Sequence, residues 1–201
     1  GSYLKRDDLR IGGFALTPAL RAQALASPPD PEIDFAANAE VQGRLPNTAG
    51  RTWTAGVGMA WIGEAANIGV AYSRTDSLYG VPIRFAVEPD QEQEGPRLKL
   101  QQDRIEARAE LTTGGSLFDK FSLRLGYADY QHAELEEDGA VGTTFFNKGL
   151  EGRLELTQAQ RGEWLGVTGG QFTTREFDVI GSEAFLPKHK SRQLGLFTVQ
   201  H

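Results

Sequence analysis

The chain has 201 residues, a formal net charge of −6 and no cysteine. The missing cysteines exclude disulfides and thiolate metal sites, and the acidic balance argues against a nucleic-acid-binding protein, which would carry a basic patch. Mean hydropathy is −0.39. No stretch approaches the roughly 18 consecutive apolar residues of a transmembrane helix, so a helical membrane protein is excluded.

The first third of the chain predicts a long loop followed by a long strand. Residues 16–47 include "ASPPDPEIDFAANAEVQGRLPN", which is rich in proline, alanine and acids and has no sustained period, so we expect a loop. Residues 51–63, "RTWTAGVGMAWIG", alternate strictly, as strands do. One face carries Trp53, Ala55, Val57, Met59 and Trp61, and the other carries Thr52, Thr54, Gly56, Gly58 and Ala60.

Further strands follow along the rest of the chain. Residues 68–82 form a hairpin with the strand before them, and the irregular segment 83–97 comes next. Residues 97–113 contain good helix formers, but their period is two, so we predict a strand. The remaining predicted strands bring the total to about eight, over residues 120–136, 143–158, 164–181 and 191–200.

The lengths of the strands and turns favour an outer-membrane barrel. Residues 97–113 and 120–136 exceed the roughly 9 to 11 residues that cross a bilayer and far exceed ordinary soluble strands. Short turns alternate with longer, more acidic loops, as in barrels with short periplasmic turns and long outer loops. The short turns are 63–67, 114–119 and 159–163, and the longer loops are 16–47, 83–96, 137–142 and 181–190.

Each strand is expected to turn one face to lipid and the other to a polar lumen. The tryptophan face of residues 51–63 meets lipid in this interpretation, with both tryptophans near headgroup zones. Alternating arginine and glutamate on the inner face predict cross-strand ion pairs. Those residues are Arg104, Glu106, Arg108, Glu110, Glu151, Arg153 and Glu155.

Four strings together resemble the TonB-dependent outer-membrane receptors, particularly the branch that includes zinc-uptake receptors. They are "SLYGVP", "LRLGYADYQHAE", "GTTFFNKGLEGRLEL" and "IGSEAFLPKHKSRQLGLF". The resemblance implies an all-β, antiparallel transmembrane barrel of 22 strands closed by an N-terminal plug. It also implies import of a scarce nutrient with TonB-supplied energy.

Under this resemblance, residues 1–201 are a partial barrel domain that lacks the plug domain and the closing strands. The implied localisation is the outer membrane of a Gram-negative bacterium. The implied partners are the lipid bilayer, the plug and remaining barrel strands of the same protein, and the TonB complex through the missing N-terminal region.

Two groups of residues are candidates for handling a metal. His132 and Glu134 share a strand face by period two and offer one nitrogen and one oxygen ligand. In the zinc branch the outer loop after the "YG-P" turn carries histidines and acids, whereas here it has acids and no histidine, which suits harder cations than zinc. These loop acids are Glu88, Asp90, Glu92 and Glu94. The resemblance thus implies that the transported nutrient is a metal, zinc or another divalent cation, as the ion or as a chelate.

We expect no enzyme and no catalytic cofactor. The sequence contains neither a glycine-rich phosphate loop that opens a helix nor a nucleophile elbow. Two alternatives to transport stay open at this point. One is a complete eight-stranded outer-membrane barrel that serves as an anchor or adhesin, and the other is a soluble β-sandwich binding domain.

Overall fold

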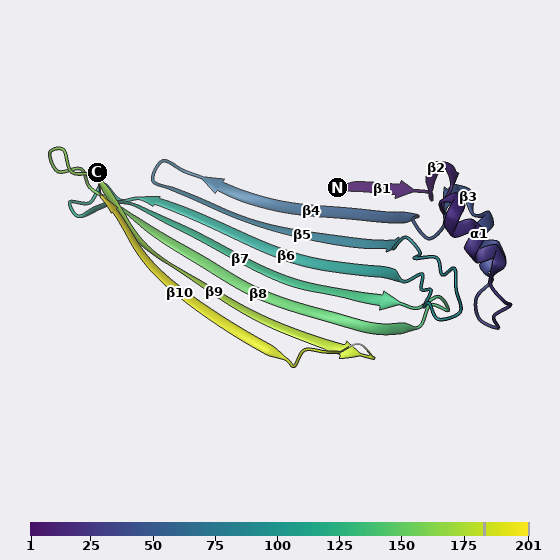
Figure 1. Ribbon diagram of the computed structural model, residues 1–201. Coiled ribbons are helices and arrows are strands. Elements are labelled where there is room, and N and C mark those ends of the chain that lie inside the picture. The colour runs from purple at the N-terminus through teal and green to yellow at the C-terminus, as the bar shows by residue number, and fades with distance from the viewer. Residues whose placement is uncertain (183, 201) are drawn as a thin grey trace.

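The computed structural model describes residues 1–182 and 184–200. Eight antiparallel strands form one curved sheet, and two further short strands pair separately (Figure 1). In sheet order the eight are β1 (Ser2–Arg6), β4 (Gly50–Ile62), β5 (Ala66–Gly80), β6 (Arg97–Thr112), β7 (Phe118–Leu135), β8 (Val141–Gln158), β9 (Gly166–Gly181) and β10 (His189–Gln200). The separate pair is β2 (Leu9–Phe14) with β3 (Gln42–Leu45).

The predicted all-β class is confirmed, and of the eight predicted long strands the sheet has seven, β4 to β10, because β1 spans only Ser2–Arg6. From β4 to β10 every strand pairs with the next one along the chain. The register is continuous from β4 to β7, so side chains opposite each other stay on one face across the sheet. The strand prediction for β6 is also confirmed, because Arg97–Thr112 pairs along its whole length with β7 and along nearly all of it with β5.

The connections divide between two rims of the sheet. Residues 63–65, 113–117 and 159–165 form short turns at one rim. At the other rim, residues 7–49 and 81–96 form long connections. Residues 136–140 form a turn there that is as short as the turns at the first rim. The predicted alternation of rims is therefore confirmed, but the long connections are confined to the first two. A further connection of that rim joins β9 to β10, and its residue 183 lies outside the described residues.

The prediction of a structureless loop over residues 16–47 is wrong, because this segment holds two helices and β3. The helices are α1 (Pro18–Ala26) and α2 (Phe35–Glu40). The Thr17 hydroxyl accepts a hydrogen bond from the amide of Leu20 at 3.4 Å and caps α1, which begins at a proline. The Asp34 carboxylate accepts from the amide of Ala37 at 2.9 Å and caps α2. Capping residues of these types stabilise a helix that is too short for a clear period.

A small hydrophobic core joins the two long connections at their rim. Phe35 and Ala39 of α2 and Ala24 of α1 are buried against Ala86 and Val87 of the 81–96 loop. Polar contacts reinforce this packing. The Asn38 side chain donates to the carbonyl of Ala86 at 2.9 Å, and the Ser27 hydroxyl donates to that of Val87 at 2.6 Å. We call the helices, β2, β3 and this docked loop the rim subdomain.

Asp8 connects the rim subdomain to the sheet. Its carboxylate accepts hydrogen bonds from the amides of Thr48 and Ala49, both at 2.8 Å, directly before β4 begins. The Thr48 amide bond is the largest cause that holds the pKa of Asp8 below its ordinary value. A carboxyl with a lowered pKa stabilises the fold above its unfolded pKa and loses that effect as the pH falls through the lowered value.

The described residues form an open sheet rather than a closed ring. Strands β1 and β10 lie at opposite edges and do not pair with each other. Strand β1 covers only the Gly50–Thr54 part of β4. A closed eight-stranded barrel is therefore not what these residues form. No second sheet packs on the long one within residues 1–182 and 184–200, so the sandwich arrangement is not found there either. Among the same residues no helix is long and apolar enough to cross a membrane.

Candidate functional site

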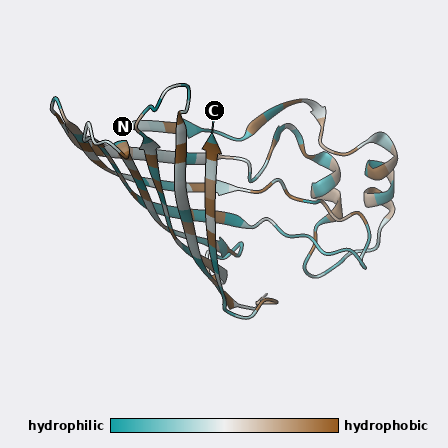
Figure 2. Ribbon diagram, turned by 90° about the vertical axis from the view of Figure 1, so that its left-hand side faces the viewer, coloured by the Kyte–Doolittle hydropathy of each residue, from teal (hydrophilic) through white to brown (hydrophobic). Residues whose placement is uncertain are grey.

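One face of the sheet carries a continuous apolar band that reaches from β4 to β10. The hydropathy colouring shows apolar and polar residues alternating along the strands (Figure 2). Side chains of the band are exposed although they are large, with Met59 at 76% and Leu196 at 82%. Its members are Val57, Met59, Trp61, Ile68, Val70, Tyr72, Ile105, Ala107, Ala109, Leu111, Phe121, Leu123, Leu125, Tyr127, Leu150, Leu154, Leu156, Phe172, Leu194 and Leu196. The predicted two faces of residues 51–63 are therefore confirmed as faces of β4.

A row of charges borders the apolar band on the same face, toward the long-loop rim. Six charged residues stand directly opposite one another on six successive strands and neutralise each other in part. Arg74 lies 3.2 Å from Asp103 and Lys148 lies 3.0 Å from Asp129. We call these six the charged row: Arg74, Asp103, Asp129, Lys148, Glu176 and Lys190. Lys188, just beyond the row, pairs with its Glu176 at 2.6 Å.

The sequence reading did not identify the charged row. On β5 to β8 this face changes from apolar to charged two residues beyond the band, as at Asp103 before Ile105, whereas on β9 and β10 Thr174 and Arg192 stand between the band and the row. Following each apolar face beyond its last hydrophobic residue would have revealed the change strand by strand. The alignment of these six charges in one row depends on the strand pairing.

The opposite, polar face is lined by small and charged side chains. Between β4 and β5 it carries hydroxyl pairs, with the Thr52 and Ser77 oxygens 2.6 Å apart and those of Thr54 and Thr75 3.2 Å apart. Gly58 lies on this face, where an added Cβ would approach the Ala71 Cβ to 3.2 Å. Side chains at this part of the polar face are thus small and leave space above the sheet.

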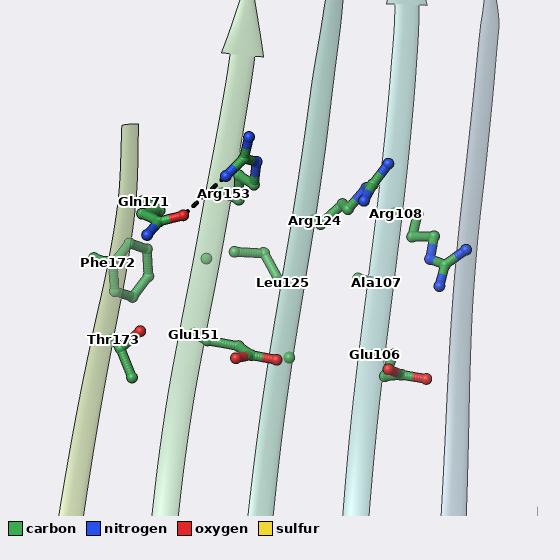
Figure 3. A pocket seen from close by; sticks show the side chains of 12 residues that line it. Glu106, Ala107, Arg108, Arg124, Leu125, Glu151, Arg153, Gln171, Phe172 and Thr173 are labelled. Carbon is green, nitrogen blue, oxygen red and sulfur yellow. Dashed lines mark hydrogen bonds between the residues drawn. The ribbon is translucent and has the colours of Figure 1, made fainter. Parts of the chain in front are cut away.

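The predicted cross-strand ion pairs on the polar face are largely wrong, because the register sets like charges opposite each other. Arg108 faces Arg124, and Arg124 faces Arg153 (Figure 3). The ion pairs run along single strands instead, from Arg104 to Glu106 at 2.9 Å and from Arg153 to Glu155 at 2.6 Å. A cross-strand pair does join Lys120 to Glu110 at 3.0 Å, but the prediction did not include that lysine.

We call Arg108, Arg124 and Arg153 the arginine row. These residues line a hollow of about 400 Å³ together with Glu106, Glu151 and Gln171. Figure 3 shows the three arginines at one level on neighbouring strands, with the two glutamates at the next level along the same strands. The Arg153 guanidinium donates to the Gln171 side chain at 2.9 Å and lies 4.2 Å above the centre of the Phe197 ring.

His132 and Glu134 share the polar face of β7, near the long-loop rim. The His132 ring stacks on Phe145, with ring centres 4.5 Å apart, and its Nδ1 lies 3.1 Å from the Tyr130 hydroxyl. His132 therefore lies between aromatic side chains. Tyr130 contacts its Nδ1, so Nε2 is the ring nitrogen that Tyr130 does not contact. Within residues 1–182 and 184–200, no three histidine, aspartate or glutamate side chains gather as a metal-binding group.

The four acids of the 81–96 loop are exposed at the long-loop rim. Glu88, Asp90, Glu92 and Glu94 follow the buried Ala86 and Val87. The Glu88 carboxylate accepts a hydrogen bond from the Gln23 side chain of α1. The loop is therefore held in place by the rim subdomain and presents its acids to solvent.

A comparison of the chain with models of known protein families found no match.

Proposed function

We propose that the chain forms part of the wall of an outer-membrane transport barrel, with the apolar band against lipid and the polar face toward an aqueous interior. The observation that carries the proposal is the exposed apolar band. An exposed apolar surface that extends over seven strands is far larger than soluble proteins usually leave uncovered, and such surfaces mark contacts with membranes or partners.

The dimensions of the band fit a bilayer. On β7 it runs from Phe121 to Tyr127, which corresponds to about 20 Å along a strand at about 3.4 Å per residue. The exposed turn residues Leu117, Trp164 and Leu165 add apolar surface at the short-turn rim. An outer-membrane barrel needs an apolar band about 25 Å tall with aromatic residues at its borders.

The charged row supports the same orientation. Charges on the lipid side are costly in the hydrocarbon and tolerable at headgroup depth. Tyr72 and Tyr127 stand in the outermost row of the band, beside the charged row, as aromatic residues do at membrane interfaces. The long-loop rim then lies outside the cell and the short turns lie in the periplasm.

Two adjacent positions on β7 test this orientation. In a chain whose Trp53, Trp61 and Trp164 are changed to phenylalanine, a Leu123→Trp probe should be strongly quenched by vesicles of lipid brominated in the acyl chain. Its neighbour on the polar face, Ser122→Trp, should be quenched several-fold less, because successive side chains of a strand point to opposite faces. Equal quenching of the two probes would contradict the proposal.

The cargo we propose is a scarce nutrient, either a metal ion such as zinc or another divalent cation, or a metal chelate, taken up with TonB-supplied energy. The resemblance of the four strings to TonB-dependent receptors suggests this class. The exposed acids of the 81–96 loop lie at the proposed outer rim, where negative charge raises the local concentration of cations. His132 and Glu134 lie deeper on the polar face and offer a second contact.

Uptake of radioactive Zn²⁺ by cells that carry the intact receptor tests the cargo. Changing Glu88, Glu92 and Glu94 to glutamine and Asp90 to asparagine should slow uptake at low metal by about tenfold, because electrostatic steering is lost. The matched control, Glu136→Gln with Glu137→Gln, removes exposed acids from the neighbouring 136–140 turn and should change uptake little. Unchanged uptake in the loop variant would remove the acids from the pathway, and unchanged uptake after His132→Ala with Glu134→Ala would remove that pair.

A further inference from the structure

The arginine row contains two guanidinium groups, those of Arg108 and Arg124, that no acid of the described residues pairs with. Neighbouring strands lie about 4.8 Å apart, so the backbone positions of Arg108, Arg124 and Arg153 span about 10 Å. Like charges directly opposite each other on a sheet are destabilising. Within residues 1–182 and 184–200, the side chains of Arg108 and Arg124 form no hydrogen bond or ion pair.

The acids beside the arginine row are mostly engaged with other groups. Arg104 holds Glu106 at 2.9 Å, and Lys120 holds Glu110 at 3.0 Å. Glu155 is held by Arg153, itself a member of the row. Glu151 is then the one adjacent carboxylate on these strands without an ion pair among the described residues, and it lies on β8 opposite Gly126, one level from the arginine row. The hollow therefore keeps a surplus of positive charge.

From this arrangement we infer that the arginine row binds a compact oxyanion that carries two or more negative groups, such as a di- or tricarboxylate or a diphosphate. Guanidinium groups hold carboxylate and phosphate oxygens in bidentate fashion, and Arg108 and Arg124 have all their donors available. Arg153 is fixed by Glu155, Gln171 and Phe197 and supplies a rigid end to the site.

The flanking acids restrict the ligand to a small one. Glu106 and Glu151 lie on one side of the arginine row, and Glu110 and Glu155 lie on the other. An extended polyanion such as an acidic peptide would meet these carboxylates, whereas a compact ligand fits between them in the hollow of about 400 Å³. The ligand thus lies along the arginine row, across the strands, with its negative groups about one strand spacing apart.

Calorimetric titration tests the site with the full chain in zwitterionic detergent micelles at low ionic strength. Citrate and pyrophosphate are the two probes, and binding of either one supports the site and identifies carboxylate or phosphate as the preferred group. The double variant Arg108→Gln with Arg124→Gln should weaken binding at least tenfold, since it removes two charged hydrogen-bonding groups. Arg124→Lys should weaken binding to a smaller extent, because it keeps the charge and loses the planar fork.

The matched control is Arg192→Gln, which removes an exposed arginine from the opposite face of β10 and should leave the affinity unchanged. The far-UV spectrum of each variant verifies that the sheet is retained. Failure of the unchanged chain to bind either probe, or equal affinity in the double variant, would overturn the inference. Because binding is measured in micelles without transport, this result is independent of the uptake experiment.

Discussion

Replacing Leu154 by arginine is expected to destabilise the chain in a bilayer by about 2 to 4 kcal/mol, the range for a cation on the lipid face at the centre of an outer-membrane barrel. Leu154 lies in the middle of the apolar band, opposite Leu123 on one side and Gly170 on the other. An arginine at position 154 would find no acidic side chain within the apolar band to pair with. The free energy of unfolding, measured by urea titration in vesicles, gives the size of the effect.

Thr157→Arg is the control for this prediction. Thr157 lies on the same strand, β8, but on the polar face, where a charge meets water and other charges. Its arginine variant should change the free energy of unfolding by less than about 1 kcal/mol, as surface substitutions usually do. If the two variants lost equal stability, or if Leu154→Arg lost none, the apolar band would not face lipid.

Replacing Phe35 by alanine should release the rim subdomain while the sheet stays folded. Phe35 is 3% exposed and is the largest side chain of the small core. Truncating a buried phenylalanine costs about 3 to 5 kcal/mol, and this core has few other large side chains to compensate. Hydrogen exchange of the Ala86 and Val87 amides, which donate to Gln93 and Gln91 side chains, should accelerate strongly.

The control for the core variant is Leu25→Ala in the neighbouring helix α1. Leu25 is 56% exposed, so its truncation removes little buried surface and should leave the exchange of both loop amides nearly unchanged. The amides of β7 and β8 should keep their protection in both variants, because the sheet does not share the core of the rim subdomain. Loss of protection in the sheet after Phe35→Ala would show that the two parts fold as one unit.

The alternation of the strands could be predicted from the sequence because it depends on local chain geometry. In β6, Ile105 and Ala107 on one side and Arg104 and Glu106 on the other already define two faces. The period of two overrides helix propensity because a long amphipathic strand gains more from pairing on both edges than from local preference. The strands and their two faces could therefore be predicted from the sequence alone.

The rim subdomain and the charge pattern were less accessible. Thr17 followed by a proline is a recognisable helix start, but α1 and α2 are too short to show a period, and their stability depends on docking with Val87, far along the chain. The arginine row depends on register. Arg108, Arg124 and Arg153 are ordinary surface residues in three separate segments, and only strand pairing brings them into line.

The nearest-neighbour order of the sheet determines which changes of chain length it can accept. From β4 onward each strand pairs with the next one along the chain, so an added residue in a turn such as 159–165 alters neither face of the flanking strands. One residue inserted within β7 would instead exchange the apolar and polar faces for all residues on one side of the insertion. Insertions and deletions tolerated during evolution should therefore accumulate at the rims, above all in the rim subdomain. Within a strand, the number of inserted or deleted residues should be even, because an even number preserves the two faces.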